Sequence, residues 1–372
     1  MNRRDFLLWT AAAGATLGVA RRVLPTSGAA ATLAARPDGL SGPRPSHHDP
    51  NGGFRNPWPT ADTREEGGFW RWQRERRQKE LAPNPPPEAL PAADPNIAYP
   101  RAGADELRIT WVGHATFLIQ VGGVNLLTDP HWSHRASPVQ FAGPARFTPP
   151  GVAWDRLPTI DAVLLSHNHY DHLDDGTVRR LRRTLWDEVR WFTPLEYRGW
   201  FRSRGVQNVT ELDWWQQTTL DGPAGPLRIV ALPCQHWTSR TPWNRQEQLW
   251  ASWAVIAPNG QSVYFGGDSG YFPGYPEIPE RVGTFDALLL PIGAYEPRWF
   301  MRPVHMNPEE ALRTYQDLGG TGTLLGMHWG TWRLTDEDPL EPPLRMRDVW
   351  DAVGLPPNQL QIPRHGETWI HT

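Results

Sequence analysis

Residues 164–173 read LLSHNHYDHL, a segment in which three histidines and one aspartate fall within six residues: His167, His169, Asp171 and His172. Imidazole and carboxylate groups are the usual ligands of borderline divalent cations such as Zn²⁺. Because alternate side chains can diverge on a tight turn, the spacing H-x-H-x-D-H can serve two ions. The apolar run IDAVLL at 160–165 is typical of a buried strand, which argues against a solvated histidine-rich loop. The pattern therefore predicts a metal centre at the end of a strand.

Three further metal-competent residues each follow a β-rich run far along the chain: His236 after RIVAL, Asp268 after SVYF and His328 after TLL. Taken singly, a lone histidine is more often structural than a ligand, and an aspartate after glycines usually belongs to a turn. Taken together, the three residues complete two coordination spheres. They can do so only if the fold gathers the ends of these strands on one edge.

The elements that must position these ligands are strands with helices between them. Strands are expected over 107–111, 116–121, 124–127, 160–165, 227–232, 262–265, 287–291 and 323–325. Gly122-Gly123 is a two-residue hairpin signal. Asn307-Pro308-Glu309-Glu310 begins a capped helix, and Gly319-Gly320 ends it. Two runs of strands with intervening helices predict two sheets that pack face to face under covering helices.

The N-terminal segment predicts export from the cytoplasm. Arg3 and Arg4 precede an apolar stretch that runs to about Ala20, and small residues at 27–31 suit a cleavage site, so residues 1–30 resemble a bacterial twin-arginine signal. The alternatives are a plain Sec signal or a retained membrane anchor, although the apolar stretch is short for a spanning helix. We expect the mature protein in the periplasm or outside the cell.

Residues 31–105 are rich in proline and tryptophan, and a short charged helix is expected over 70–81. Proline-rich chain cannot bury enough surface to fold alone, so we expect an N-terminal arm that its tryptophans tie down on the core. The remaining residues, 106–372, are expected to form one domain that carries the metal centre.

Charge and cysteine content exclude several classes of protein. The full chain of 372 residues has a formal net charge of −3, and loss of residues 1–30 removes four arginines and one aspartate, which leaves −6. A mildly acidic mature chain is a poor candidate for non-specific nucleic-acid binding. Cys234 is the single cysteine, so an internal disulfide framework is excluded.

The order HxHxDH, His, Asp, His resembles the metallo-β-lactamase superfamily, and longer strings are more specific. Strings similar to those of the N-acylphosphatidylethanolamine-hydrolysing phospholipase D family are NPWPT at 56–60, WVGHATFLIQ at 111–120, LLTDP at 126–130, SHNHYDHLD at 166–174, LPCQHW at 232–237, FGGDSGY at 265–271, PIGAYEPRWFM at 291–301, HMNPEEA at 305–311 and HWGTW at 328–332. The likeness covers most of the mature chain. It implies that residues 106–372 form an αββα four-layer sandwich, with a one- or two-zinc site on the edge between its sheets.

Carried onto this sequence, the family pattern assigns seven ligands to two Zn²⁺ ions. One ion is assigned to His167, His169 and His236. The other is assigned to Asp171, His172 and His328, and Asp268 bridges both.

Four further residues are weaker candidates for roles at the site. Tyr170 and His305 match positions that contact substrate in the family, with simple packing as the alternative for each. Asp129 either fixes the tautomer of a ligand histidine or serves as a turn carboxylate, and His114 either supports a ligand or lines the pocket.

Two adjacent cations can acidify a shared water to a pKa of about 7 and neutralise a phosphate oxygen. The resemblance implies that the metal-bound hydroxide attacks the phosphorus of N-acyl phosphatidylethanolamine, or of a related glycerophospholipid, and releases an N-acylethanolamine and phosphatidic acid. Asp171 and Asp268 are then catalytic through the ions that they hold. Hydrolysis of another ester class, such as lactones, is the alternative, and a zinc-dependent binding protein without turnover is a third. The strings GAYEPRWFM and HMNPEEA favour the phospholipase.

A phospholipid substrate implies work at a membrane surface. The chain holds 21 tryptophans, which suit an acyl-chain groove and a bilayer contact but equally suit core packing. The resemblance also implies a homodimer, for which the sequence carries no independent feature.

Overall fold

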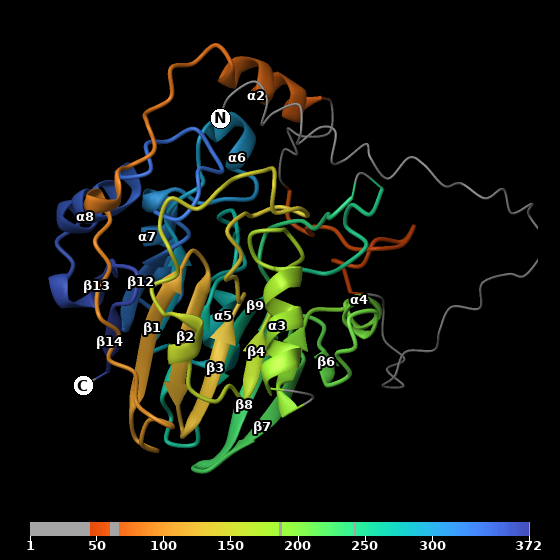
Figure 1. The fold of residues 1–372 in the computed structure, drawn as a ribbon, viewed down its shortest axis with the longest axis vertical. Helices are drawn as coiled ribbons and strands as arrows, with labels where there is room; N and C mark the ends of the chain where they lie inside the picture. Colours follow the sequence, from red (N-terminus) through yellow and green to blue (C-terminus); the bar gives the residue numbers. More distant parts are fainter. Residues whose placement is uncertain (1–44, 60–66, 186–187, 242, 372) are drawn as a thin grey trace, which may run out of the picture.

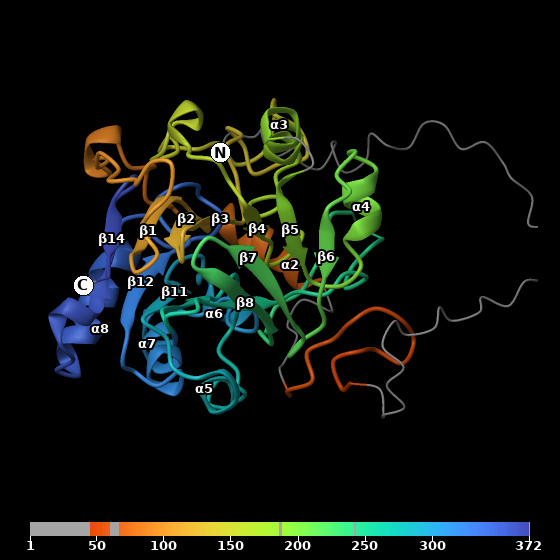
Figure 2. The same ribbon diagram turned by 90° about the horizontal axis from the view of Figure 1, so that it is seen from below.

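The computed structural model describes residues 45–59, 67–185, 188–241 and 243–371. The twin-arginine segment predicted over 1–30 and the start of the arm lie outside these residues. Within them, two seven-stranded sheets pack face to face (Figures 1 and 2).

The first sheet has the strand order β14-β1-β2-β3-β4-β5-β6. Its strands are β1 (Leu107–Gly113), β2 (Thr116–Val121), β3 (Val124–Thr128), β4 (Ala162–Leu164), β5 (Arg190–Thr193), β6 (Val209–Glu211) and β14 (Thr368–Ile370). The pairs from β14 to β3 are antiparallel, and those from β3 to β6 are parallel. The β2–β3 hairpin turns at Gly122 and Gly123, whose φ angles of 58° and 74° lie in the left-handed region that glycine adopts without strain. The predicted hairpin is thereby confirmed.

The second sheet has the order β13-β12-β11-β10-β9-β8-β7. Its strands are β7 (Gln217–Gly222), β8 (Gly225–Leu232), β9 (Ser252–Ile256), β10 (Ser262–Phe265), β11 (Ala287–Pro291), β12 (Thr323–Met327) and β13 (Leu360–Gln361). The strands from β10 to β13 are parallel, whereas β9 is antiparallel to both β8 and β10. Consequently β8, β10 and β12 all run in the same direction.

Helices cover the outer faces of both sheets. The outer face of the first sheet carries α3 (Asp175–Leu185) and α4 (Arg198–Arg202), and that of the second carries α5 (Glu277–Val282), α7 (Pro308–Asp317) and α8 (Glu341–Ala352) (Figure 2). Two helices lie together beyond one end of the sheets: α2 (Gly68–Arg76) and α6 (Arg298–Met301) (Figure 1). Short 3₁₀ turns occur at η1 (Pro87–Ala89), η2 (Trp154–Arg156) and η4 (Pro357–Gln359). The predicted αββα sandwich is confirmed.

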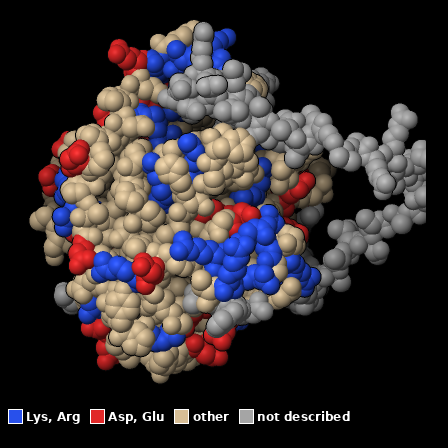
Figure 3. Space-filling model, viewed as in Figure 1, with Lys and Arg blue, Asp and Glu red and all other residues tan. Residues whose placement is uncertain are grey.

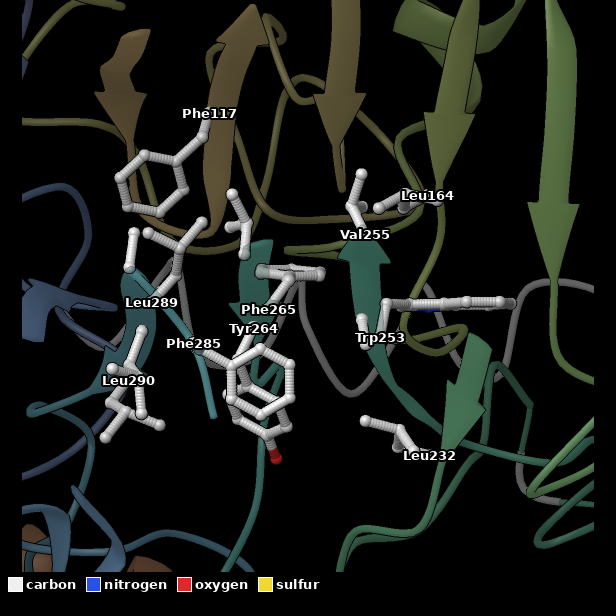
Figure 4. Packing of buried hydrophobic residues seen from close by; sticks show 14 of the residues in the cluster. Phe117, Leu164, Leu232, Trp253, Val255, Tyr264, Phe265, Phe285, Leu289 and Leu290 are labelled. Carbon is white, nitrogen blue, oxygen red and sulfur yellow. The ribbon is translucent and has the colours of Figure 1, made fainter. Parts of the chain in front are cut away.

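Side chains alternate between two apolar layers along the strands of the first sheet. In β2, Phe117 and Ile119 enter the large core between the sheets, whereas Leu118 packs in the smaller cluster beneath α3. The second sheet contributes residues such as Phe265 and Leu289 to the central core (Figure 4). Burial on both faces explains why strands such as β11 are apolar throughout.

Residues of the described part of the arm contact the domain. Trp72 of α2 is 6% exposed, its ring stacks on Phe300 of α6 at 5.1 Å, and its Nε1 donates to Asp336. The helix expected over 70–81 begins two residues earlier and ends at Arg76. Residues 77–80 are exposed, so continued helix would gain no packing there, and prolines follow shortly. The division into segments 1–30, 31–105 and 106–372 stays a prediction.

Candidate metal centre

The topology brings the predicted ligands to one edge of the sandwich. Because β8, β10 and β12 are parallel to one another, their carboxyl ends meet at the same edge of the second sheet. His236, Asp268 and His328 follow these three ends within four residues. In the first sheet, β4 ends at Leu164 and delivers the loop that carries the other four predicted ligands.

The first group of converging nitrogens consists of His167, His169 and His236. Nδ1 of His169 lies 2.8 Å from Nε2 of His167 and 3.2 Å from Nε2 of His236. His167 and His236 are buried. Three imidazole nitrogens that face one another in a buried space provide the donor set of a zinc-type cation.

The second group consists of Asp171, His172 and His328. The Nε2 atoms of His172 and His328 lie 3.3 Å apart, and Oδ2 of Asp171 lies 3.4 Å and 3.6 Å from them. Two ring nitrogens and a carboxylate oxygen therefore converge on a second point.

Asp268 connects the two groups. Its Oδ2 lies 3.1 Å from Nε2 of His172 in the second group, and 3.8 Å and 3.9 Å from the Nε2 atoms of His167 and His236 in the first. Its Oδ1 lies 3.0 Å from Nε2 of His328. The carboxylate is 2% exposed, so it faces both groups with almost no access to solvent.

Burial sets the protonation of the first group. Desolvation lowers the pKa of His167 and His236 well below the ordinary value and lowers that of His169 to about 3. These imidazoles are therefore neutral at pH 7. Neutral imidazole is the form that offers a lone pair to a metal.

The pKa values in the second group shift differently because carboxylates lie beside its histidines. Burial acts to lower the pKa of His328, but Asp268 and Asp171 outweigh it and raise that pKa to about 9. Burial likewise acts to raise the pKa of Asp268, but His172 and His328 hold it well below its usual range. A divalent cation bound among these side chains would displace the proton that His328 carries.

Two predicted supporting residues contact this group. Asp129 is fully buried, and its Oδ2 lies 2.7 Å from Nδ1 of His172. Nε2 of His114 lies 2.9 Å from Oδ2 of Asp171, and its ring lies 3.8 Å from that of His328. Asp129 contacts His172 through the ring nitrogen that points away from the group, whereas Nε2 of His114 meets the same Asp171 oxygen that faces His172 and His328, so His114 lies among the converging donor atoms.

Backbone strain gathers at the same edge. His114, Asp129 and His328 have φ angles of 55°, 32° and 66°, in the left-handed region that residues with a Cβ rarely adopt. Such residues cost about 1–3 kcal/mol each and persist where the surrounding structure holds them. Here the strain turns three side chains toward the converging groups.

The two predicted substrate contacts lie in different surroundings. Nδ1 of His305 is buried without a hydrogen-bond partner among the described residues and lies 3.9 Å from Oδ2 of Asp268. The Tyr170 hydroxyl donates to the carbonyl of Arg240, whose guanidinium lies over the Tyr170 ring. Tyr170 lines a cavity of about 660 Å³, to whose described wall no predicted metal ligand contributes. His305 thus faces the metal centre directly, whereas Tyr170 faces a neighbouring hollow.

Two residues near the centre are absent from the sequence-based set. Ser166 donates its backbone N–H to Oδ1 of Asp129 at 2.7 Å, and its hydroxyl donates to Oδ2. His131 packs against Trp332, with its Nε2 3.1 Å from the carbonyl of Tyr170. His131 directly follows the string LLTDP, and Ser166 begins the string SHNHYDHLD, so both positions carried a signal that could have identified them.

Comparisons with known proteins identify the family of the chain. Residues 124–329 match the model of the β-lactamase superfamily domain, and residues 1–20 match that of the twin-arginine translocation signal sequence. N-acyl-phosphatidylethanolamine-hydrolyzing phospholipase D 1 of Caenorhabditis elegans is 40% identical over 250 residues, which cover 65% of this chain and 69% of that protein. A metal-dependent hydrolase of Methanopyrus kandleri is 29% identical over 239 residues, 63% of this chain and 89% of that protein.

A solved metallo hydrolase from Ignicoccus hospitalis has the same fold. It superposes with a TM-score of 0.53 at 22% identity and covers 72% of this chain and 99% of its own. The chain belongs to the metallo-β-lactamase superfamily, in which it is similar to the N-acyl-phosphatidylethanolamine-hydrolysing phospholipases D. It is a metal-dependent hydrolase that carries a signal for export by the twin-arginine route. A helix with the length and apolar character of a membrane span does not occur among the described residues.

Proposed function

We propose that the protein is a zinc-dependent phosphodiesterase of the phospholipase D type. It hydrolyses N-acyl phosphatidylethanolamine, or a related glycerophospholipid, to phosphatidic acid and an N-acylethanolamine. The observation that carries the proposal is the position of Asp268 between two groups of three ligands. The 40% identity to a relative named for this reaction supports the substrate.

In this proposal, His167, His169 and His236 hold one Zn²⁺, Asp171, His172 and His328 hold the other, and Asp268 is shared. Two bound ions would lower the pKa of a water molecule and would neutralise the negative charge of a phosphate oxygen. The protein's own contribution is to orient the donors. Asp129 holds the protonated Nδ1 of His172, which leaves Nε2 free to face the centre.

The neighbouring side chains position substrate. His305 presents a buried ring nitrogen beside Asp268, where it can hydrogen bond to a substrate oxygen. Burial lowers the pKa of His305 to about 4, so the ring is neutral and can either donate or accept. Tyr170 acts from the adjacent cavity, where Trp200 and Arg240 also lie.

A basic helix supports work at an anionic membrane surface. Arg179, Arg180, Arg182 and Arg183 of α3 are all exposed, and Figure 3 shows a basic area where α3 lies in Figure 1. Exposed arginines near an anionic bilayer contribute about 1 kcal/mol each. Together with the export signal, the basic helix supports the proposal that the enzyme meets its substrate in the periplasm or outside the cell. A homodimer stays a prediction from the resemblance.

The substrate proposal is tested with the zinc-loaded mature chain and three compounds: N-acyl phosphatidylethanolamine, a soluble phosphodiester and an acyl-homoserine lactone. We expect phosphatidic acid from the first compound and its loss in Asp268→Asn, with full activity in the exposed control Asp155→Asn. Lactone opening without phosphodiester cleavage would favour the alternative ester hydrolase. The ligand assignment is tested separately, since His169→Ala must lose bound zinc.

A further inference from the structure

A second cluster of metal-competent side chains lies outside the metal centre. His47 and His48 of the arm face Asp213, which lies in the loop between β6 and β7. The cluster shares no residue with the two groups that Asp268 connects. No role in the proposed hydrolysis accounts for it.

The three side chains converge on one point. Nε2 of His47 lies 2.6 Å from Oδ1 of Asp213, and Nε2 of His48 lies 2.7 Å from Oδ2. Side chains of successive residues in extended chain point to opposite sides. Here a turn, closed by the hydrogen bond from His48 N to Pro45 O at 3.0 Å, brings both rings to the same carboxylate. His48 and Asp213 are separated by 165 residues in the sequence. Two adjacent histidines reach one carboxylate over this separation only if the backbone holds a specific conformation.

The carboxylate is held in place by its own loop. Oδ1 of Asp213 accepts the backbone N–H of Trp214 at 2.8 Å, and the backbone N–H of Asp213 donates to the Gln216 side chain at 2.9 Å. Trp214 is anchored in turn, because its Nε1 donates to the carbonyl of Trp250 at 2.7 Å. The acid is therefore held by its own loop in addition to the two histidines.

Aromatic rings form the walls of the cluster. The His47 ring stacks on Trp214 at 4.2 Å, and the His48 ring meets the edge of Phe54 at 5.1 Å. The side chains of His47, His48 and Asp213 are only 7%, 18% and 14% exposed. These walls fix the imidazole planes and restrict water, which is how supporting side chains orient metal ligands.

We propose that His47, His48 and Asp213 form a separate mononuclear site for a zinc-type divalent cation that fastens the N-terminal arm to the sandwich. Two imidazole nitrogens and a carboxylate oxygen suit Zn²⁺, and a fourth, tetrahedral position stays open to water. In a tetrahedral zinc site with bonds of about 2.0–2.1 Å, the ligand atoms stand about 3.3 Å apart. The present distances of 2.6 Å and 2.7 Å between the histidine nitrogens and the Asp213 oxygens are shorter, so small side-chain rotations would be needed to admit the ion. One ion bound by His47 and His48 of the arm and by Asp213 of the β6–β7 loop would close a long loop of chain. Closure of such a loop by a metal ion would stabilise the folded protein.

The test is the zinc content of the full mature chain. Each variant is stripped with a chelator, reloaded with zinc sulfate, freed of excess metal by gel filtration and measured by mass spectrometry. Wild type is expected to hold one equivalent more than His47→Ala, His48→Ala and Asp213→Asn. The matched control is His134→Ala, an exposed histidine that should leave the zinc content unchanged.

Asp213→Asn is expected to fold, because asparagine preserves the shape of the side chain and can still accept a hydrogen bond from Trp214 N. It therefore separates loss of zinc binding from loss of folding. Its circular dichroism spectrum should match wild type. Equal zinc content in folded wild type and folded Asp213→Asn overturns the proposal and leaves a metal-free ion pair. Loss of more than one equivalent also overturns it, since the site would then not be separate. The readout is a difference in zinc content, so an absence of phospholipase activity does not affect it.

Discussion

Oδ2 of Asp129 lies 2.7 Å from Nδ1 of His172, and both residues are fully buried at the edge of the first sheet. The other oxygen of Asp129 accepts the backbone N–H of Ser166. The carboxylate thus links the end of β3 to the loop after β4, and in the proposed site it would fix which nitrogen of His172 carries a proton. Support of this kind typically accounts for a 10- to 100-fold difference in metal affinity.

Asp129→Asn is therefore expected to weaken zinc binding about 10- to 100-fold. The asparagine oxygen can serve either His172 or Ser166 but not both, and its NH₂ group would face a donor. Competition with a chromophoric chelator measures the affinity. Asp155→Asn, at an exposed position, is the control, and equal affinities in the two variants would show that Asp129 is only a turn carboxylate.

Removal of metal is expected to destabilise the fold, because an ion that binds only the native state stabilises it by mass action. Free zinc at 100 times its dissociation constant corresponds to about 2.7 kcal/mol. Thermal unfolding followed by tryptophan fluorescence should shift to lower temperature with chelator and return when zinc is restored. An unchanged midpoint would contradict a bound ion.

The candidate ligands could be predicted from the sequence because each carries a local signal. His236, Asp268 and His328 lie one to four residues after the ends of apolar strands, and their meeting follows from the directions of those strands. The contacts behind the ligands have no such signal. Asp129 and His172 are separated by 43 residues, and their pairing depends on how β3 and β4 align.

Several strands were not predicted, for reasons that their burial explains. In β7, only Leu220 is buried, so the alternating pattern is too weak to indicate a strand. By contrast, β9 is buried along nearly all its length, and a short apolar run of this kind does not distinguish a strand from a helix. The two residues of β13 are held by β12 and have no pattern of their own.

The N-terminus of α7, next to His305, depends on a reciprocal cap. Glu310 N donates to the Asn307 side chain at 3.0 Å, and the Glu310 carboxylate accepts from Asn307 N. Asn307→Ala should lower the free energy of unfolding by about 1 kcal/mol, whereas Asn307→Ser should retain most of it. Denaturant unfolding measures both, and equal losses would mean that the cap contributes little.

Glu337 holds the loop that follows β11. Its carboxylate accepts the backbone N–H groups of Ala294 at 2.6 Å and Glu296 at 3.1 Å, one on each oxygen. Glu337→Gln would set an NH₂ group against one of these donors, so we expect a loss of about 1–3 kcal/mol in unfolding free energy. The exposed Glu88→Gln is the control. If Glu337→Gln and Glu88→Gln have equal free energies of unfolding, water replaces the lost carboxylate acceptor at no cost in stability.

Docking of the arm helix α2 rests on Trp72, which stacks on Phe300 and donates to Asp336. A buried tryptophan replaced by alanine loses about 3–5 kcal/mol of packing, and most of that loss should appear as local opening of α2. Trypsin should then cleave at the arginines of α2 much faster in Trp72→Ala than in wild type, because cleavage follows the population of the open form.

Trp70, in the same helix, is 61% exposed, so Trp70→Ala is a matched control that should leave the cleavage rate unchanged. Trp72→Phe keeps a stacking ring without the indole N–H and should fall between the two. Equal rates in all variants would mean that α2 is held instead by Arg76, whose guanidinium donates to the carbonyls of Leu334 and Thr335.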